Sequence, residues 1–345
     1  MQYRKQIGWW LMTGVIMIVI QVVLGGITRL TGSGLSITEW KPILGSIPPM
    51  NEADWNHAFD LYKSATGQYK YLNADFTLSD FKFIYFWEWL HRNWARFIGV
   101  VFLLPFGWFW YKKAFTPEMV PKLIALFVLG IAQGLIGWIM VKSGLTDDNL
   151  YVSHIRLAIH FVSALVLLAF TYWFAMDVMI PSSARQSNPT YHRWVTFILG
   201  LLLLQLVYGA FMAGLKAASA ASTWPDINGS YFPEALVHQN WVNHPIVVHF
   251  VHRTLAYLLF VAILFISIRS AKMNGSLLWK KWRFLPMILV FIQVLLGIGS
   301  VLMATETQRN GFGAFEWAAQ IHQIVAMFLL MALLFHLFLV RDQKS

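Results

Sequence analysis

Long runs of apolar residues without any charge recur along the chain and determine its predicted architecture. A helix that crosses a membrane needs about 20 consecutive, mostly apolar residues, and most of these runs reach that length. The two shortest reach it if the His-Arg turns that precede them are helical. We therefore predict an all-α integral membrane protein with eight transmembrane helices. The runs are Gly8–Thr28, Phe97–Tyr111, Leu123–Val141, Leu157–Met176, Trp194–Leu215, Thr254–Ile268, Phe284–Thr305 and Trp317–Val340.

A Gln-x-x-x-Gly spacing repeats in the first, third, fifth and seventh of these runs. Residues four apart lie on one face of a helix. Within a membrane, glycine allows two helices to approach closely, and glutamine can hydrogen-bond across the interface between them. One such pair would carry little information, but four pairs at corresponding places indicate an internal repeat. The pairs are Gln21/Gly25, Gln133/Gly137, Gln205/Gly209 and Gln293/Gly297.

The even-numbered runs repeat a histidine. A His-Arg pair precedes the apolar part of the second and sixth helices, with its histidine at His91 and His252. An Ile-His pair near the start of the fourth and eighth helices contains His160 and His322. Each histidine of the first half of the chain therefore has a counterpart in the second half.

These repeats divide the chain into two tandem halves, residues 1–180 and 190–345. Each half is predicted to be a four-helix bundle. Because an even number of membrane crossings separates the copies, both halves have the same orientation. They should be related by a pseudo-twofold axis along the membrane normal.

Composition and charge agree with a membrane protein and indicate its orientation. The chain is 58% hydrophobic and only 12% charged, whereas a soluble domain carries about 25% charged residues. All acidic residues except Glu118, Asp177 and Asp342 fall on the side opposite Met1, where the longest loop lies. The short loops on the side of Met1 are basic, which places both termini in the cytoplasm. The net charge of +10 therefore reflects topology, and no nucleic-acid partner is expected.

The first apolar run is expected to remain as a helix, because it lacks a small-residue cleavage site. The chain contains no cysteine. This excludes disulfides, haem ligated by thiolate and iron–sulfur clusters held by cysteine.

Four histidines are candidate metal ligands: His91, His160, His252 and His322. In a four-helix bundle, residues on facing helices can meet in the core, where cofactor sites are built. Two imidazoles on facing helices, without a thiolate or a carboxylate cluster, suit axial ligation of haem iron. The alternative is a solvated histidine at the membrane surface. That alternative explains one such residue more easily than two matched pairs.

Arginines beside these histidines fit the carboxylates of haem. Arg92 and Arg253 each follow a candidate ligand, and Arg96 lies one turn further on. A guanidinium group pairs well with a propionate carboxylate. The alternative is an arginine whose apolar stem packs on the helix while its head reaches water at the membrane surface.

Glu88 is the one ionisable acid beside a candidate ligand. It lies three residues before His91, on the same helical face, whereas the corresponding residue before His252 is His249. An acid beside a metal–oxygen centre can relay protons or act as a general acid or base. The alternatives are an ion pair with a neighbouring arginine or an acid stabilised at a helix N-terminus. This difference suggests that the catalytic reaction takes place in the first half and that the second half holds a second haem.

The remaining histidines fit these roles less well. His336 lies on roughly the face of His322, 14 residues further on, where it could serve a second haem stacked across the membrane. No other candidate ligand has a histidine at that spacing, so both haem sites are expected near the outer face and His336 is expected to pack in the core. Loop positions are expected for His57, His192, His238 and His244.

Several motifs together resemble the haem A synthase family, in its cysteine-free form found in mitochondria and many proteobacteria. Residues 25–50, GGITRLTGSGLSITEWKPILGSIPPM, are similar to the family's first outer loop, including its Trp-x-Pro and Pro-Pro continuation. The segments EWLHR, HFVHR and IHQ also match. The resemblance spans essentially the whole chain.

The resemblance implies oxidation of a ring methyl group of haem O, a farnesylated haem, to a formyl group. The product is haem A for cytochrome oxidase. It further implies that His91 and His160 hold the substrate haem with Glu88 assisting, and that His252 and His322 ligate a resident haem b. Expected partners are a membrane enzyme that makes haem O, cytochrome oxidase assembly factors, an electron donor and a second copy of the chain. The bacterial inner membrane is the expected location.

Two other functions are compatible with the repeat alone. One is a di-haem cytochrome b that carries electrons from quinol, although that task commonly places haems on opposite membrane faces. The other is a haem transporter without oxidase activity. Glu88 distinguishes them from the enzyme, because neither alternative needs an acid beside one haem only.

Overall fold

The computed structural model describes residues 3–39, 44–145, 149–306 and 311–341. Among these residues it contains eight helices long and apolar enough to cross a membrane, the seventh being formed by α11 and α12 together. This confirms the predicted all-α architecture with eight spans. The long helices are α1 (Arg4–Leu30), α4 (Leu78–Tyr111), α5 (Met119–Lys142), α6 (His154–Met179), α7 (Pro189–Gly214), α10 (Pro245–Ala271), α12 (Leu285–Leu302) and α13 (Ala314–Leu339).

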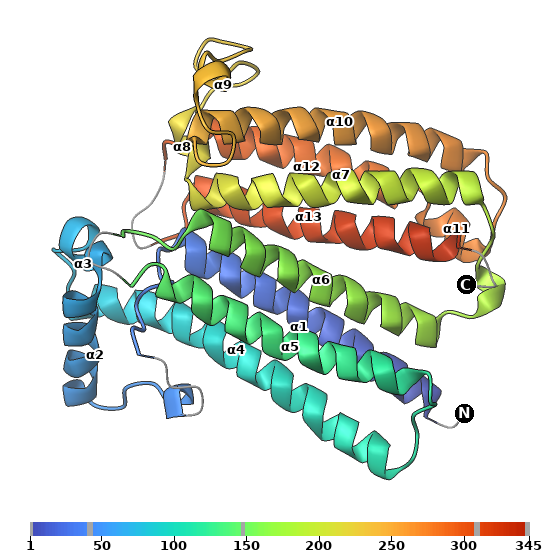
Figure 1. Ribbon diagram of the computed structural model, residues 1–345, viewed down its shortest axis with the longest axis horizontal. Helices are drawn as coiled ribbons and strands as arrows, with labels where there is room; N and C mark the ends of the chain where they lie inside the picture. Colours follow the sequence, from blue (N-terminus) through green and yellow to red (C-terminus); the bar gives the residue numbers. More distant parts are fainter. Residues whose placement is uncertain (1–2, 40–43, 146–148, 307–310, 342–345) are drawn as a thin grey trace.

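Short helices lie at the ends of the long ones. At one end of the bundle, α2 and α3 stand beside the start of α4, and α8 and α9 lie beside the start of α10 (Figure 1). Apart from an isolated bridge between Ile227 and Ser230, the described residues contain no β-structure. The short elements are η1 (Leu44–Ser46), α2 (Glu52–Ala65), α3 (Gly67–Leu72), η2 (Ser182–Ala184), α8 (Ala217–Ala220), α9 (Ala235–His238) and α11 (Leu277–Trp282).

Polar caps set the start of α4, which begins much earlier than its apolar run. Thr77 accepts a hydrogen bond from the Asp80 backbone, and the Asp80 carboxylate accepts one from the Thr77 backbone, which together make a capping box. Glu88 and His91 therefore lie inside the helix, more than two turns from its N-terminus. This excludes the interpretation of Glu88 as an acid stabilised by the helix N-terminus, because that effect falls off within the first turn.

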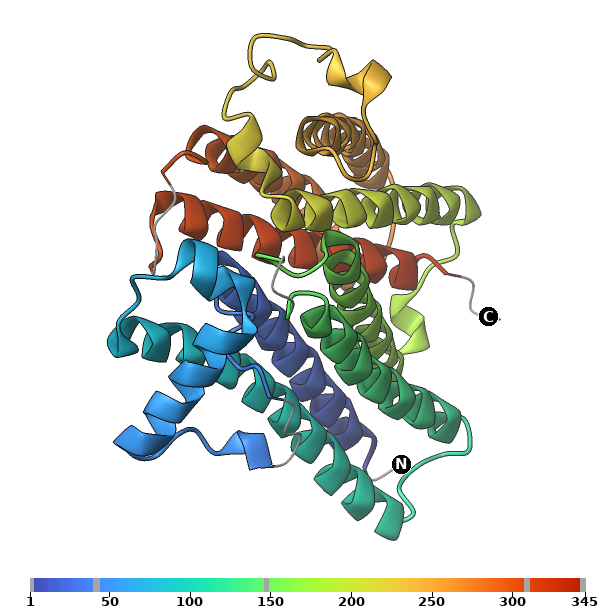
Figure 2. The ribbon, with the colours of Figure 1, turned by 60° about the vertical axis from the view of Figure 1, so that its left-hand side comes forward.

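The long helices pack so that each half forms a layer of neighbours. In the first half α1 contacts α4 and α6, and α5 contacts α6; in the second half α7 contacts α10 and α13, and α12 contacts α13. The halves meet where α6 contacts α7 and where α13 contacts α1 and α6. Figure 2 shows the first four long helices, blue to green, below the second four.

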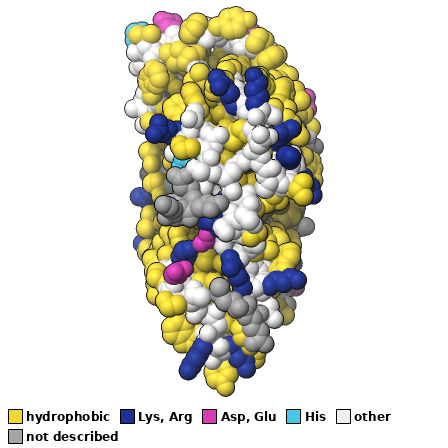
Figure 3. All heavy atoms as spheres, turned by 90° about the vertical axis from the view of Figure 1, so that its right-hand side faces the viewer, with side chains coloured by type: hydrophobic (Ala, Val, Ile, Leu, Met, Phe, Trp, Pro, Cys, Tyr) yellow, Lys and Arg dark blue, Asp and Glu magenta, His cyan; other side chains and the backbone are white. Residues whose placement is uncertain are grey.

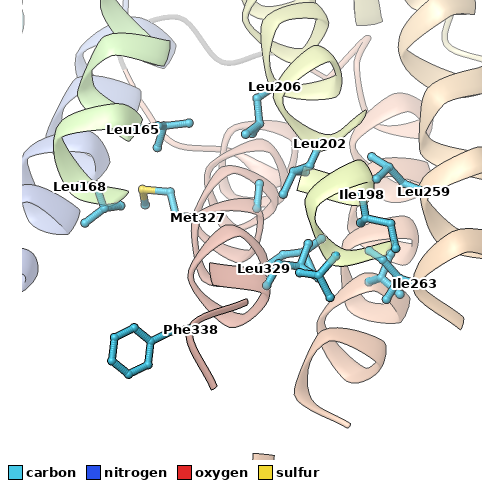
Figure 4. Packing of buried hydrophobic residues seen from close by; sticks show 14 of the residues in the cluster. Leu165, Leu168, Ile198, Leu202, Leu206, Leu259, Ile263, Met327, Leu329 and Phe338 are labelled. Carbon is cyan, nitrogen blue, oxygen red and sulfur yellow. The ribbon is translucent and has the colours of Figure 1, made fainter. Parts of the chain in front are cut away.

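The largest buried core spans both halves, with most of its residues in the second half and the rest on α1 and α6. Leu165 and Leu168 of α6 point toward Met327 of α13, while Ile198 and Leu202 of α7 pack on the far side of the same helix (Figure 4). All five side chains are buried. Burial of one such side chain from water contributes about 1.5–3 kcal/mol. The contribution is smaller where the side chain leaves lipid instead of water. Close packing and polar contacts are therefore also needed to hold the two halves together.

Two glutamines of α13 make those polar contacts. The side-chain amide of Gln323 donates to the Val22 carbonyl at 3.0 Å, and that of Gln320 donates to the Val23 carbonyl at 3.3 Å. Both glutamines lie directly against Gly26. A side chain at Gly26 would displace the ends of both glutamines and so disturb their hydrogen bonds to α1.

At the opposite end of the bundle, where α1 begins and α13 ends, basic side chains are prominent and acidic ones few (Figure 3). Asp177 at the end of α6 is surrounded by three of them. Its carboxylate lies 2.6 Å from Arg341, 2.9 Å from Lys122 and 3.4 Å from Arg185. These bonds join α5, the link between the halves and the end of α13.

Asp177→Ala is expected to lower the stability of the folded bundle by about 1–3 kcal/mol, because it leaves three neighbouring cations without their anion. Thermal unfolding in detergent, followed by tryptophan fluorescence, measures the change. The control is Asp60→Ala, which breaks the exposed pair with Lys63 and should change the midpoint very little. Equal shifts for both variants would show that Asp177 does not join the halves.

Candidate haem site

Each Gln-x-x-x-Gly repeat meets one of the four candidate histidines on a neighbouring helix. In the first half, the Gln21 amide nitrogen lies 3.2 Å from His91 Nδ1, and the Gln133 amide nitrogen lies 3.2 Å from His160 Nδ1. Both amides also donate to the backbone carbonyl of the same histidine. Since an amide NH₂ only donates, each imidazole nitrogen is the acceptor.

In the second half the glutamines again contact the histidines, but at the other ring nitrogen. The Gln205 amide nitrogen lies 3.3 Å from His252 Nε2, and that of Gln293 lies 3.1 Å from His322 Nε2. His322 Nδ1 in turn donates to the Gln293 carbonyl at 3.0 Å. A metal-binding histidine typically uses its second nitrogen in this way, because the bond fixes the tautomer and the orientation of the ring.

The repeated glycines lie against the same imidazole rings. A methyl group in place of the glycine hydrogen would lie 3.2 Å from the ring carbon Cε1 of His91 at Gly25, and 2.8 Å from that of His160 at Gly137. The corresponding distances in the second half are 3.3 Å at Gly209 and 3.1 Å at Gly297. Each repeat is therefore a cradle in which glutamine orients a histidine and glycine leaves room for it.

Gly137→Ala is expected to displace the His160 ring, because 2.8 Å is shorter than a carbon–carbon contact can be. A displacement approaching 1 Å at a reacting centre costs up to about 100-fold in rate. The oxidation of haem O that the sequence motifs imply would then fall, and the yield of haem A from membranes measures the loss. Gly107→Ala, which meets no atom within 4 Å, is the control. Full haem A yield from Gly137→Ala would show that this cradle is not needed.

One cavity of about 1240 Å³ contains all four histidines on its wall. This exceeds the usual range of about 300–1,000 Å³ for a site that holds one ligand. Both halves line it: His91 and His160 from the first, His252 and His322 from the second. Glu88, Arg92, Arg96 and Arg253 line it as well, so every residue predicted from the sequence as part of the site borders the same space.

The two histidines of the second half lie at the separation that a shared metal ion requires. Their ring centres are 6.4 Å apart. A metal bonded at about 2 Å to one nitrogen of each ring would hold the centres roughly 6–6.5 Å apart. Among the described residues, no three His, Asp or Glu side chains gather to form a bare metal site. The chemistry of the donors therefore fits haem iron, because the porphyrin ring supplies most of its ligands and two histidines can supply the rest.

Glu88 is buried, and both oxygens of its carboxylate have polar partners. Its carboxylate accepts hydrogen bonds from the Ser36 hydroxyl at 2.7 Å and the Ile37 backbone N–H at 2.8 Å, and it forms an ion pair with Arg92 at 2.5 Å. The predicted alternative of an ion pair with a neighbouring arginine is thus present. The carboxylate also fixes the first outer loop, since Ser36 and Ile37 belong to it.

The rest of that loop is supported from α2 and α3. Gly32 has a left-handed backbone (φ 68°), and its carbonyl accepts a hydrogen bond from the Gln68 side chain at 3.1 Å. Gln68 accepts a hydrogen bond from the Tyr62 hydroxyl at 3.2 Å. Burial raises the pKa of Tyr62 to about 12, so this hydroxyl keeps its proton at ordinary pH. The loop residues Trp40 and Pro42 lie outside the described residues.

The arginines make contacts that the sequence did not predict. Arg92 also donates to the Ile37 carbonyl at 2.9 Å, and Arg96 donates to the Asn93 side chain at 2.8 Å. In the second half Arg253 donates to the carbonyls of Asp226 at 2.7 Å and Thr223 at 2.9 Å. Arg92 and Arg253 therefore perform the same task, since each holds an outer loop over the end of its own bundle.

His249 occupies in the second half the place of Glu88. It is buried, and Arg253 lies 3.0 Å from its Nε2, just as Arg92 pairs with Glu88. The loop that Arg253 holds is further ordered by Asp226. A hydrogen bond from the Gly229 N–H, and then one from the Thr223 hydroxyl, lower the pKa of the Asp226 carboxyl.

Of the other histidines, His336 lies where the sequence placed it. It is buried and bonded to the Tyr191 hydroxyl at 2.9 Å, with its ring against Trp279, which confirms its packing role. The prediction of loop positions holds for His244, directly before α10, but is wrong for His57 in α2, His192 in α7 and His238 in α9, because these helices form or extend outside the apolar runs. None of these histidines lines the cavity.

Sequence reasoning missed three cavity residues: Arg29, Tyr151 and Lys216. Arg29 had a detectable signal, because it follows Gln21 and Gly25 at the same four-residue spacing and therefore shares their helical face. Tyr151 and Lys216 have no counterparts in the repeat, so nothing in the sequence pattern indicated them.

Taken together, these features define a class: a multi-pass helical membrane protein with a large cavity, four partly buried histidines on its wall and donors suited to haem iron. A family model described as cytochrome oxidase assembly protein matches residues 8–334. The chain belongs to this family, which agrees with the resemblance found from its motifs.

Curated relatives cover nearly the whole chain. A "Heme A synthase" of Flavobacterium psychrophilum is 39% identical over 339 residues, covering 96% of this chain and 96% of its own length. One from Flavobacterium johnsoniae is 38% identical and covers 97% of both chains. One from Rhodospirillum centenum is 42% identical over 287 residues, 81% of this chain and 73% of its own length.

Proposed function

We propose that this protein oxidises a ring methyl group of haem O to a formyl group and so makes haem A for cytochrome oxidase. The observation that carries the proposal is the set of four glutamine–histidine–glycine cradles around one cavity. The curated relatives, which match end to end and are heme A synthases, favour this enzyme over a pure electron carrier or a haem transporter.

In this proposal the second half holds a resident haem b between His252 and His322. The 6.4 Å between their ring centres and the bond from His322 Nδ1 to the Gln293 carbonyl support the assignment. When bound, a haem of this type supplies one-electron chemistry. The protein's part is to orient the two rings and to exclude water from them.

His91 and His160 hold the substrate haem O, and with Glu88 they form the catalytic group. Both histidines line the same cavity, and the Gln21 and Gln133 amides each contact the Nδ1 atom of one of them. Glu88 accepts a proton released as the C–H bonds of the methyl group are oxidised. Its hydrogen bonds to the first outer loop keep the carboxylate in place beside His91.

Arg92, Arg96 and Arg253 would contact the haem propionates at the outer rim of the cavity, which all three line. A guanidinium has five N–H donors, so Arg92 and Arg253 can hold their loop carbonyls and still pair with a carboxylate. In this role each arginine joins the outer loop to the edge of the ligand.

The two halves, residues 1–180 and 190–345, are proposed to be related by a pseudo-twofold axis along the membrane normal. The helix contacts support this relation. Exchanging the halves turns the contact of α6 with α7 into the contact of α13 with α1, and it leaves the contact of α6 with α13 unchanged.

We place the protein in the bacterial inner membrane with both termini in the cytoplasm and the haem sites toward the outer face. The basic end of the bundle (Figure 3) supports this orientation, because cytoplasmic loops carry an excess of Lys and Arg. Haem O would come from the membrane enzyme that makes it. An electron donor, cytochrome oxidase assembly factors and a second copy of the chain are the other expected partners.

The test is production of haem A in a bacterium that makes haem O but has no haem A synthase of its own. Haems extracted from membranes are separated by chromatography and identified by mass and spectrum. Haem A should appear only when the chain is expressed. Membranes that contain the protein, haem O and haem b but no haem A would contradict the proposal.

A further inference from the structure

Arg29 reaches from one half of the protein to the other. It lies in the last turn of α1, four residues after Gly25 and eight after Gln21, so its side chain leaves the same helical face. Its guanidinium donates to the Ala213 carbonyl at the end of α7 and lies 5.8 Å from the centre of the Tyr151 ring. By the repeat, Ala213 corresponds to Arg29 itself, since it follows Gln205 by the same eight residues.

Lys216 approaches the same ring. Its ammonium group lies 4.1 Å from the centre of the Tyr151 ring and donates to the Tyr151 hydroxyl at 2.6 Å. The backbone of Lys216 is left-handed (φ 51°), a conformation that an L-residue adopts at a cost. Arg29, Tyr151 and Lys216 all line the cavity, at the place where the halves meet.

Two cations on one aromatic ring repel each other, and an anion between them would offset that repulsion. The described carboxylates form no ion pair with either residue. Each cation also has donors beyond these contacts, because a guanidinium carries five N–H groups and an ammonium three.

We propose that Arg29 and Lys216, with the Tyr151 hydroxyl between them, bind a haem propionate carboxylate where the two halves meet. This rests on the proposed function, which places haems in the cavity. The carboxylate has two possible sources, the substrate haem of the first half and the resident haem of the second. In either case the site couples ligand binding in one half to the contact with the other.

The test compares haem b with its dimethyl ester, which lacks both carboxylates. Full-length protein, purified in detergent from haem-limited cells, is titrated with each compound and followed by its Soret band. Two parent variants show which haem supplies the carboxylate. His252→Ala keeps only the haem site of the first half, and His91→Ala keeps only that of the second half. In at least one parent, the free acid should bind at least about 10-fold more tightly than the ester, as expected for charge-assisted hydrogen bonds.

Arg29→Gln and Lys216→Gln should each reduce that preference several-fold in the same parent, and Arg29→Lys should restore part of it. Lys216→Gln leaves the bond from Arg29 to Ala213 intact, so its effect cannot come from loosening the halves. The matched control is Arg156→Gln. Arg156 also lies at the outer end of a helix and donates to a backbone carbonyl, at 3.0 Å, but it does not line the cavity.

The parent in which the preference falls identifies which haem supplies the carboxylate. An unchanged preference in both parents, with normal haem binding, would overturn this proposal and leave the proposed function standing. If neither parent binds haem at all while the unmodified chain does, the separation into two histidine sites is wrong, and this inference fails with it.

Discussion

Glu88→Gln is expected to keep both haems bound yet lower the conversion of haem O by about 100-fold or more, the range typical for loss of a general acid or base. The amide oxygen of glutamine can still accept hydrogen bonds from Ser36 and Ile37, so the first outer loop should stay in place. What is lost is a group that can take up a proton, together with the negative charge that pairs with Arg92. Haem A yield per molecule of haem b measures the effect.

Glu88→Ala separates this role from a purely structural one. It removes the acceptor as well as the acid, and it leaves Arg92 without its buried partner, which is strongly destabilising. If Glu88→Gln makes haem A at the normal rate and only Glu88→Ala fails, the carboxylate holds the loop and performs no chemistry. Asp80→Asn, in the capping box of the same helix, is the control for effects on helix stability.

His252→Ala or His322→Ala is expected to abolish the low-spin spectrum of the resident haem b. Each change would remove one of the two histidines that are proposed to hold this haem and whose ring centres lie 6.4 Å apart. The reduced-minus-oxidised spectrum of purified protein measures the loss. His336→Ala is the control, because His336 bonds to Tyr191 in the core and does not line the cavity. A normal bis-histidine spectrum after either change would contradict the assignment.

The number of helices and the internal repeat could be predicted because both depend only on residues that are close together in the sequence. Eight apolar runs are visible without knowledge of packing, and Gln21/Gly25 and its three counterparts share a helical face in any helical structure. The sequence pattern does not show which side chain each repeated glutamine contacts. That each glutamine meets a histidine depends on how α1, α5, α7 and α12 are rotated against their neighbours.

The roles of the arginines were harder to predict, because they depend on loops. Arg92 and Arg253 follow the candidate ligands, which suggested propionates, yet both hold backbone carbonyls of outer loops. Loop conformation is decided by hydrogen bonds between distant residues, such as the one from Gln68 to Gly32. Arg29 acts across the two halves, so its contact with Ala213 could be found only from the assembled structure.

The central claim is that the first half converts haem O while the second half holds haem b. His160→Ala tests it most directly, through the haems extracted from the purified variant alongside the unmodified protein. The account predicts haem b at its normal level and no haem A. Normal haem A with His160 replaced, or loss of haem b from a correctly folded variant, would contradict the division between the halves.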